Sequence, residues 1–110
     1  MILAEPLGYL DFLNVNMNSR LVLTDSGGLQ EETTALGIPC ITMRPNTERP
    51  ITEKLGTNHV VGNNPDTIRQ QLKKILDNET IQGQIPPKWD GKAGERIVEI
   101  LLQKNRNGSL

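Results

Sequence analysis

The sequence has few aromatic residues, one cysteine and one histidine. Its 110 residues include one Trp, one Tyr and one Phe, so we expect no aromatic platform for single-stranded nucleic acid. Cys40 cannot form an internal disulfide, and the absence of a disulfide is typical of a reducing compartment. One Cys and one His are too few for a metal site with nitrogen and sulfur ligands. We therefore expect a cytoplasmic protein without a metal.

A strong charge of one sign and long apolar runs are also absent. Twelve Lys and Arg residues face 13 Asp and Glu residues, and no basic stripe is present, so nucleic acid is not an expected partner. No apolar stretch approaches the length of a membrane span, and residues 1–4 do not resemble the start of a signal peptide. The length suits one small domain with a single core.

Short apolar runs alternate with helical patterns along the chain. They predict strands at 2–4, 20–24, 40–43 and 58–61, and helices at 9–17, 29–36, 47–55, 64–76 and 93–103. This alternation is typical of an α/β fold, in which an open, Rossmann-like parallel sheet is flanked by helices. Ligands of such sheets bind at the carboxyl ends of the strands. We expect residues 1–104 to form this unit and residues 105–110 to form a flexible tail.

Ser26, Gly27 and Gly28 stand where a predicted strand passes into a predicted helix. The first turn of a helix presents free backbone N–H groups at the positive end of the helix dipole. Phosphates bind at such ends, and glycine lets them approach the backbone closely. Ser26 has no visible histidine partner, so we expect its hydroxyl to cap the helix or contact a phosphate. These residues form a candidate phosphate site.

The helix at 29–36 carries a carboxylate close to its apolar side. At about 100° per residue, the apolar side consists of Leu29, Ala35 and Leu36, and Gln30, Glu31 and Thr34 lie away from it. Glu32 falls between Ala35 and Leu36. It either accepts hydrogen bonds from ligand hydroxyls or extends from the core edge into water, and the spacing supports both equally. Glu31 is expected to be solvated.

Several single residues carry weaker signals. Phe12 lies off the Leu10, Leu13 and Met17 stripe of its helix, and it either stacks on a flat ligand ring or packs against the preceding loop. Arg49 follows a predicted strand, where arginine can clamp a phosphate, although surface arginines are common. His59 begins a strand and is interpreted as structural. In the helix at 93–103 we expect four buried residues, Ile97, Val98, Leu101 and Leu102.

Four segments resemble one enzyme family. They are residues 23–32 (LTDSGGLQEE), 43–50 (MRPNTERP), 5–12 (EPLGYLDF) and 90–97 (DGKAGERI). Together they resemble the non-hydrolysing UDP-N-acetylglucosamine 2-epimerases, and the resemblance covers nearly the whole chain. It implies the carboxy-terminal part of a two-domain, glycosyltransferase-B-like fold with the ligand between the domains.

The resemblance also implies roles for individual residues. Ser26, Gly27 and Gly28 are expected to hold the UDP diphosphate, and Glu32 the ribose hydroxyls. Phe12 is expected to face the uracil, the backbone near Leu7 to read the edge of that base, and Arg49 to lie near the phosphate or the sugar. The family interconverts UDP-N-acetylglucosamine and UDP-N-acetylmannosamine by removing the C2 proton, eliminating UDP and adding it back on the other face. It implies no metal or nicotinamide cofactor.

The matching segments imply only the last part of such an enzyme. We therefore expect no catalytic residues here, because the family's acid/base carboxylates belong to the amino-terminal domain. A parallel sheet cut through its middle has an unpaired edge, so we expect a homo-oligomer or another chain over that edge. Two alternatives stay open: a fragment of a glycosyltransferase of the same fold, and a non-catalytic α/β binding or interaction module.

Overall fold

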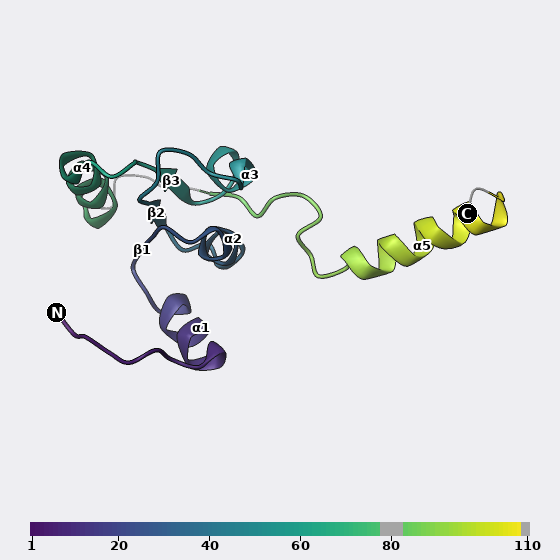
Figure 1. Cartoon of the computed structure of the whole chain (residues 1–110), viewed down its shortest axis with the longest axis horizontal. Helices are drawn as coiled ribbons and strands as arrows, with labels where there is room; N and C mark the ends of the chain where they lie inside the picture. The colour runs from purple at the N-terminus through teal and green to yellow at the C-terminus, as the bar shows by residue number, and fades with distance from the viewer. Residues whose placement is uncertain (78–82, 109–110) are drawn as a thin grey trace.

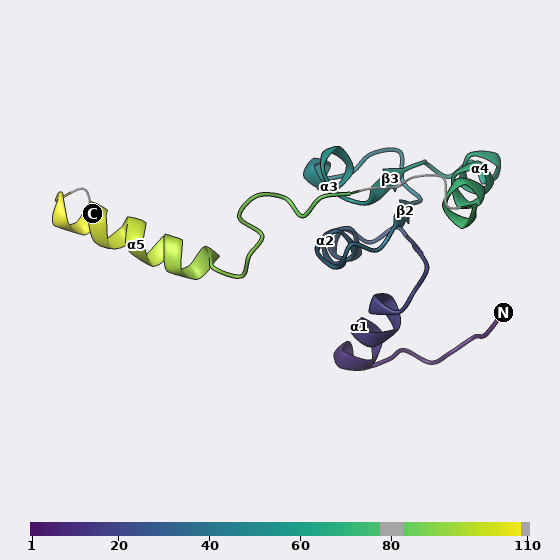
Figure 2. The ribbon, with the colours of Figure 1, turned by 180° about the vertical axis from the view of Figure 1, so that it is seen from behind.

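Helices and strands alternate along the chain in the computed structural model, which describes residues 1–77 and 83–108 (Figure 1). The elements are α1 (Tyr9–Met17), β1 (Val22–Thr24), α2 (Gly27–Leu36), β2 (Cys40–Thr42), α3 (Pro50–Lys54), β3 (Asn58–Val60), α4 (Pro65–Leu76) and α5 (Ala93–Arg106). The three strands form one parallel sheet in the order β1-β2-β3. Helices α2 and α3 lie on one side of this sheet and α4 on the other, as Figures 1 and 2 both show. The predicted open α/β sheet is confirmed.

The strand register brings the loops after β1 and β2 together. The first residues of the three strands, Val22, Cys40 and Asn58, are aligned across the sheet. Beyond the strand ends, the amide of Met43 donates to the carbonyl of Thr24 at 2.8 Å, so the pairing continues into the loop. The segments that follow β1 and β2 therefore begin side by side at the carboxyl edge of the sheet, where ligands of such sheets bind.

The buried interior is mostly polar. Its buried hydrophobic residues are Cys40, Ile41 and Ile75, and its buried polar residues are Asn16, Thr24, Gln30, Thr33, Thr34, Thr42, Thr52, Thr57 and Asn58. Buried polar groups are stable only when they are hydrogen-bonded. Among the described residues the hydroxyl of Thr42 donates to Asn58 Oδ1 at 2.5 Å, and Asn58 Nδ2 donates to Thr52 Oγ1 at 3.0 Å. Directional bonds thus replace part of an apolar core.

Helix α2 presents a different side to the sheet than its apolar pattern predicts. Gln30 and Thr34, which we expected to face away from the core, are each 1% exposed, whereas Ala35 is exposed. The expected orientation is wrong because the sheet side of α2 is lined by hydrogen-bonding threonines and Asn58 rather than by apolar residues. The helix also begins at Gly27, two residues earlier than predicted, so both glycines of the candidate phosphate site lie in its first turn.

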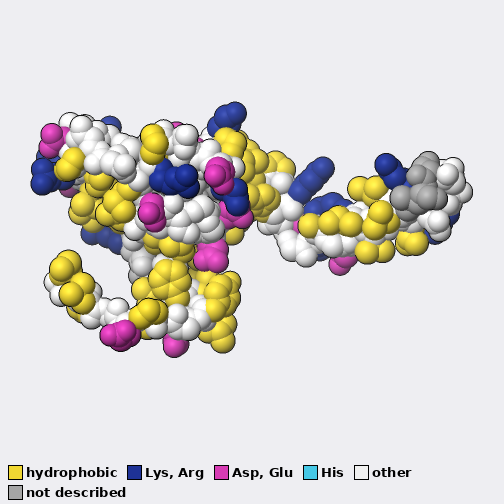
Figure 3. All heavy atoms as spheres, viewed as in Figure 1, with side chains coloured by type: hydrophobic (Ala, Val, Ile, Leu, Met, Phe, Trp, Pro, Cys, Tyr) yellow, Lys and Arg dark blue, Asp and Glu magenta, His cyan; other side chains and the backbone are white. Residues whose placement is uncertain are grey.

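The amino-terminal segment differs from the prediction. Residues 2–4 form no strand, and Ile2 and Leu3 are exposed. Helix α1 has the predicted bounds, but Leu10 and Met17 of its apolar stripe are exposed. The pattern fails there because the side of α1 that is buried contains Asn16. Figure 3 shows hydrophobic side chains at the surface over this segment and α1.

Helix α5 extends away from the sheet, and the expected burial of its apolar side is wrong. Ile97, Val98, Leu101 and Leu102 are between 47% and 58% exposed, and the helix is set apart from the sheet in Figure 1. The radius of gyration is 17.6 Å, compared with about 13 Å for a compact domain of this size. The helix continues to Arg106, past residue 105 where a tail was expected. The apolar pattern correctly predicted that a helix forms here, but it did not show that its apolar side would be exposed.

The predicted helix ends are largely confirmed. Gly37 ends α2 in the left-handed conformation, with φ of 72°. Asn64 caps α4 by accepting a hydrogen bond from the amide of Asp66 at 2.8 Å, and Pro65 occupies the first helical position. Helix α3 is shorter than expected, because it begins at Pro50 rather than at residue 47.

Replacing Gly56 with alanine is predicted to destabilise the fold. An added Cβ would lie 2.5 Å from the Thr34 side chain and from the Thr52 carbonyl oxygen, which are parts of the polar interior. We expect Gly56→Ala to lower the free energy of unfolding by about 1–3 kcal/mol in urea titrations. Gly94→Ala is the control, because it lies in α5 with open space around it. Equal stability of the two variants would show that Gly56 is not closely packed.

Candidate functional site

The amino-terminal end of α2 is an open, positively polarised helix end. Ser26 is the N-cap with an extended backbone, and Gly27 and Gly28 form the start of the first turn. No acidic residue lies in that turn, so the helix dipole is not neutralised from within it. An added Cβ would meet nothing within 4 Å at Gly27, and only Ser26 Oγ, at 3.9 Å, at Gly28. An anion can therefore reach the free backbone N–H groups.

Ser26 itself does not cap α2 with its side chain. No side-chain cap hydrogen bond forms, and its backbone N–H donates instead to Thr24 Oγ1 at 3.0 Å. Of the two roles expected for its hydroxyl, helix capping is therefore wrong in this structure, and contact with a phosphate stays a prediction.

The loop after β2 is hydrogen-bonded to α2. The hydroxyl of Thr47 donates to Gln30 Oε1 at 2.5 Å, and the same oxygen accepts a bond from Asn58 Nδ2 at 3.1 Å. Thr47 Oγ1 in turn accepts a hydrogen bond from the backbone N–H of Arg49 at 2.9 Å. The buried amide of Gln30 thus connects the loop, α2 and β3, and fixes where the backbone of Arg49 lies.

Arg49 pairs with a carboxylate of α2. Its Nε donates to Glu31, and its Nη1 lies 3.8 Å from Glu48 Oε2. The expectation that Glu31 is merely solvated is therefore wrong. Because the Arg49 and Glu31 side chains are 42% and 44% exposed, the pair contributes little stability, under about 1 kcal/mol. Its main effect is to hold the guanidinium beside α2, close to the helix whose first turn is open.

Glu32 lies at a shallow pocket on the outer side of α2. The pocket has a volume of about 270 Å³ and is lined by Glu31, Glu32, Ala35 and Trp89. Glu32 is half-buried and makes no hydrogen bond or ion pair within residues 1–77 and 83–108. Both open interpretations, hydrogen bonds to ligand hydroxyls and extension into water, are compatible with this position, and the contact with ligand hydroxyls stays a prediction.

Leu7 and Phe12 are less well defined as site residues. Leu7, 47% exposed, precedes α1, and Phe12, 38% exposed, lies on that helix. Neither lines the pocket beside Glu32. Helix α1 packs on α2, so both residues belong to a neighbouring surface. Ser26, Gly27, Gly28 and Glu32 belong to α2 and its N-cap, and the fold brings Arg49 beside that helix. The ligand contacts expected of all seven residues stay predictions.

Titratable groups elsewhere are mainly structural. Burial lowers the pKa of His59, against the opposing influence of Glu53, so the neutral imidazole is favoured in the folded protein. Burial likewise raises the pKa of the Cys40 thiol, which agrees with a buried strand residue. The Arg96 guanidinium holds the pKa of Asp90 below its usual range, and this exposed pair follows Trp89. None of these groups faces the Glu32 pocket as a proton donor.

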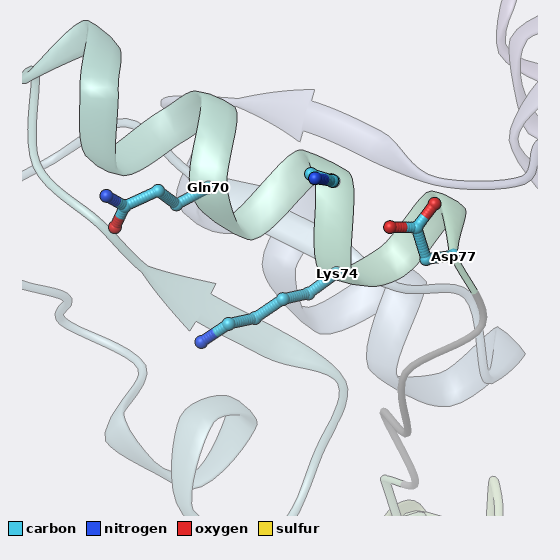
Figure 4. Close-up of a pocket in the computed structure, with 4 residues that line it drawn as sticks. Gln70, Lys74 and Asp77 are labelled. Carbon is cyan, nitrogen blue, oxygen red and sulfur yellow. The ribbon is translucent and has the colours of Figure 1, made fainter.

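A second pocket, on α4, does not have convergent groups. It is lined by Gln70, Lys73, Lys74 and Asp77. Figure 4 shows Gln70 and Lys74 extending to one side of the helix, while Asp77 lies at its end and points elsewhere.

Within the described part of the chain, no three or more His, Cys, Asp or Glu side chains are placed to hold a metal ion. None of the helices formed by the described residues is long and apolar enough to cross a membrane.

Three residues around α2 have positions that the sequence pattern did not indicate. Gln30 was placed on the outer side of the helix, Glu31 was expected to be solvated, and Trp89 was not singled out as a site residue. Glu31 and Arg49 are separated by 18 residues, and no local pattern connects them. No local signal marks Gln30 as buried, because its partners Thr47 and Asn58 lie 17 and 28 residues away in sequence.

Comparison with known proteins gives one consistent family. The family model described as UDP-N-acetylglucosamine 2-epimerase matches residues 1–102. The chain is 47% identical over 97 residues to the UDP-N-acetylglucosamine 2-epimerase of Methanocaldococcus jannaschii, covering 88% of this chain and 26% of that protein. It is 41% identical over 102 residues to the enzyme of that name from Methanococcus maripaludis, covering 93% and 27%. The chain thus spans about a quarter of the length of these relatives.

Solved structures agree with this result. The M. jannaschii enzyme in complex with UDP-GlcNAc and UDP matches with a TM-score of 0.76 and 46% identity, over 91% of this chain and 27% of that one. The Neisseria meningitidis enzyme bound to UDP-GlcNAc matches with a TM-score of 0.79 and 35% identity, over 90% and 28%. The expected fold, part of a glycosyltransferase-B-like structure, is confirmed.

Removing the amide of Gln30 is predicted to destabilise the site's framework. Gln30→Met keeps the side-chain length but leaves the hydroxyl of Thr47 and Nδ2 of Asn58 without this acceptor. An unsatisfied buried polar group costs about 1–3 kcal/mol. Gln30 Nε2 is buried without a partner among the described residues, and its removal offsets part of that cost, so we expect the free energy of unfolding in urea to fall by about 1 kcal/mol. The control is Gln70→Met on the exposed side of α4. Unchanged stability in Gln30→Met would contradict the framework role.

Proposed function

The chain belongs to the UDP-N-acetylglucosamine 2-epimerase family, and we propose that it binds the UDP part of a UDP-sugar at the amino-terminal end of α2. Ser26, Gly27 and Gly28 hold the diphosphate, and Glu32 accepts hydrogen bonds from the ribose hydroxyls. Arg49 lies near the phosphate or the sugar. Family membership favours this assignment over a fragment of a glycosyltransferase.

The observation that carries the proposal is the unobstructed first turn of α2. Its two glycines leave the backbone N–H groups accessible, and the turn contains no carboxylate that would compete with a phosphate. One helical turn further along, Glu32 offers a carboxylate without a described partner. A diphosphate bound at the helix end has its attached sugar within reach of that carboxylate, because Gly28 and Glu32 are only about 6 Å apart along the axis.

Arg49 supports the same assignment. A guanidinium can bind a carboxylate and a phosphate through different N–H groups, and the pair with Glu31 uses Nε. A phosphate at α2 can therefore accept hydrogen bonds from the other N–H groups of Arg49. The loop that carries Arg49 does not have to move far, because Thr47 holds it against α2. On this account Glu31 keeps Arg49 close to the site when no ligand is bound.

The uracil is proposed to lie toward α1. Phe12 is partly exposed on that helix, and Leu7 lies in the exposed segment before it. In the proposal the Phe12 ring faces the base, and the backbone near Leu7 reads its edge. The packing of α1 on α2 supports this arrangement, because it sets that surface beside the helix that carries the proposed diphosphate site.

We propose that a protein containing this chain interconverts UDP-N-acetylglucosamine and UDP-N-acetylmannosamine. The relatives that bear the enzyme's name are about four times as long as the matched region. The described residues supply nucleotide contacts, whereas proton transfer at the sugar C2 is assigned to carboxylates outside this chain. The chain alone is therefore expected to bind UDP without catalysing epimerisation.

A negative charge at the cap of α2 is predicted to separate folding from binding. Ser26→Asp retains a good N-cap residue and adds a charge that suits the helix dipole, so stability is kept or raised. The same charge repels the diphosphate, and we expect UDP to bind at least about tenfold more weakly in titration calorimetry. Ser26→Asn is the neutral control. UDP affinity equal in all three proteins would contradict a diphosphate at this turn.

A further inference from the structure

Trp89 is the only tryptophan of the chain and forms one wall of the pocket beside Glu32. The residue is half-buried and lies in the segment between residue 83 and α5. Trp89 lines this pocket together with Glu31, Glu32 and Ala35, although more than 50 residues separate it from them in sequence. A large aromatic side chain beside a carboxylate without a described partner is a combination that the residue roles proposed above do not use.

The backbone around Trp89 is held in a defined conformation. Its amide donates to the carbonyl of the buried Pro86 at 3.2 Å. Lys88 has φ of 71°, a left-handed conformation that costs energy in a residue with a side chain. On the other side, Asp90 accepts a hydrogen bond from the Lys92 amide at 3.0 Å and pairs with Arg96. These contacts hold the backbone at Trp89.

The pocket continues the side of α2 that holds the proposed diphosphate site. Residues four and seven apart lie on one side of a helix, so Gly28, Glu32 and Ala35 share a side. The buried Gln30 and Thr33 lie on the opposite side, against the sheet. A ligand that starts at Gly28 and follows this side passes Glu32 and reaches Trp89. The groups it meets are, in order, backbone N–H donors, a carboxylate and an aromatic ring.

That order matches the chemistry of a nucleoside diphosphate. Phosphates suit the N–H donors, and neighbouring hydroxyls suit a carboxylate that accepts two hydrogen bonds. The remaining surface of a ribose is its apolar C–H face, which packs well on an aromatic ring. Glu31 does not compete for the hydroxyls, because Arg49 already pairs with it.

We propose that Trp89 is the ribose platform of the site, with the indole against the C–H face of the ribose whose hydroxyls bind Glu32. This inference rests on the proposed function and adds to it a residue that determines the preference for a nucleoside over a bare diphosphate. Trp89 makes this contact directly, and it takes no part in proton transfer.

The fluorescence of Trp89 tests the proposal, because no other tryptophan contributes to the signal. The intact chain is titrated with UDP, ribose 5-phosphate and pyrophosphate. UDP and ribose 5-phosphate are expected to change the emission, and pyrophosphate is expected to bind without changing it. A change with UDP but not with ribose 5-phosphate would overturn the ribose assignment in favour of the base. A change with pyrophosphate alone would also overturn it.

Variants add a second measurement by calorimetry. Trp89→Leu is expected to weaken UDP binding about tenfold and to leave pyrophosphate binding unchanged, and Trp89→Phe is expected to retain most of the UDP affinity. Ile100→Ala, an exposed apolar residue on α5 outside the proposed site, is the control. If UDP binds Trp89→Leu as tightly as the unmodified chain, the platform is overturned and the proposed function stands. If no ligand binds the unmodified chain, both proposals fail.

Discussion

The structure depends on a buried layer of hydrogen bonds between α2 and the sheet. At its centre Gln30 Oε1 accepts bonds from Thr47 and Asn58, and Asn58 continues the network to Thr42 and Thr52. In the described part of the chain the buried core residues are Cys40, Ile41 and Ile75, so apolar burial alone does not fix the position of α2. Hydrogen bonds are directional, and a helix held by them has one preferred rotation. That rotation determines which residues of α2 face the sheet and which face outward.

The rotation of α2 also determines which chemical groups lie on its outward side. With Gln30 and Thr34 directed inward, the open first turn, Glu32 and the pocket beside Trp89 share the opposite side. The loop after β2 is held to the same helix through Thr47, which keeps Arg49 beside Glu31. The proposed nucleotide site is therefore a surface of one helix whose supporting contacts lie on that helix's buried side. Its groups are in place before a ligand binds, which reduces the ordering cost of binding.

Much of the fold could be predicted from sequence, because local signals mark where elements begin and end. The glycine pair, Gly37 and the Asn64–Pro65 start give the bounds of α2 and α4 to within two residues.

Packing partners could not be predicted in the same way. The apolar pattern of α5 indicates a helix, yet nothing in that pattern states what it packs against, and its apolar residues are exposed. The side of α2 was predicted wrongly because Gln30 and Thr34 were counted as solvent-facing, whereas both are buried and Asn58, nearly 30 residues away, donates a hydrogen bond to Gln30. The part of the candidate site that is formed by adjacent residues could be predicted from the sequence. The position of Trp89 beside Glu32 could not, because it depends on the fold.

The central claim is that the first turn of α2 is a preformed phosphate site with the nucleoside lying toward Glu32. Amide chemical-shift mapping by NMR during a titration with UDP tests it most directly, because each backbone N–H is observed separately. We expect the largest shifts at Gly27, Gly28 and Leu29, with smaller ones at Glu32 and the Trp89 indole. Shifts confined to another region, such as the Lys73–Lys74 side of α4, or no shifts at the α2 turn at saturating UDP, would contradict it.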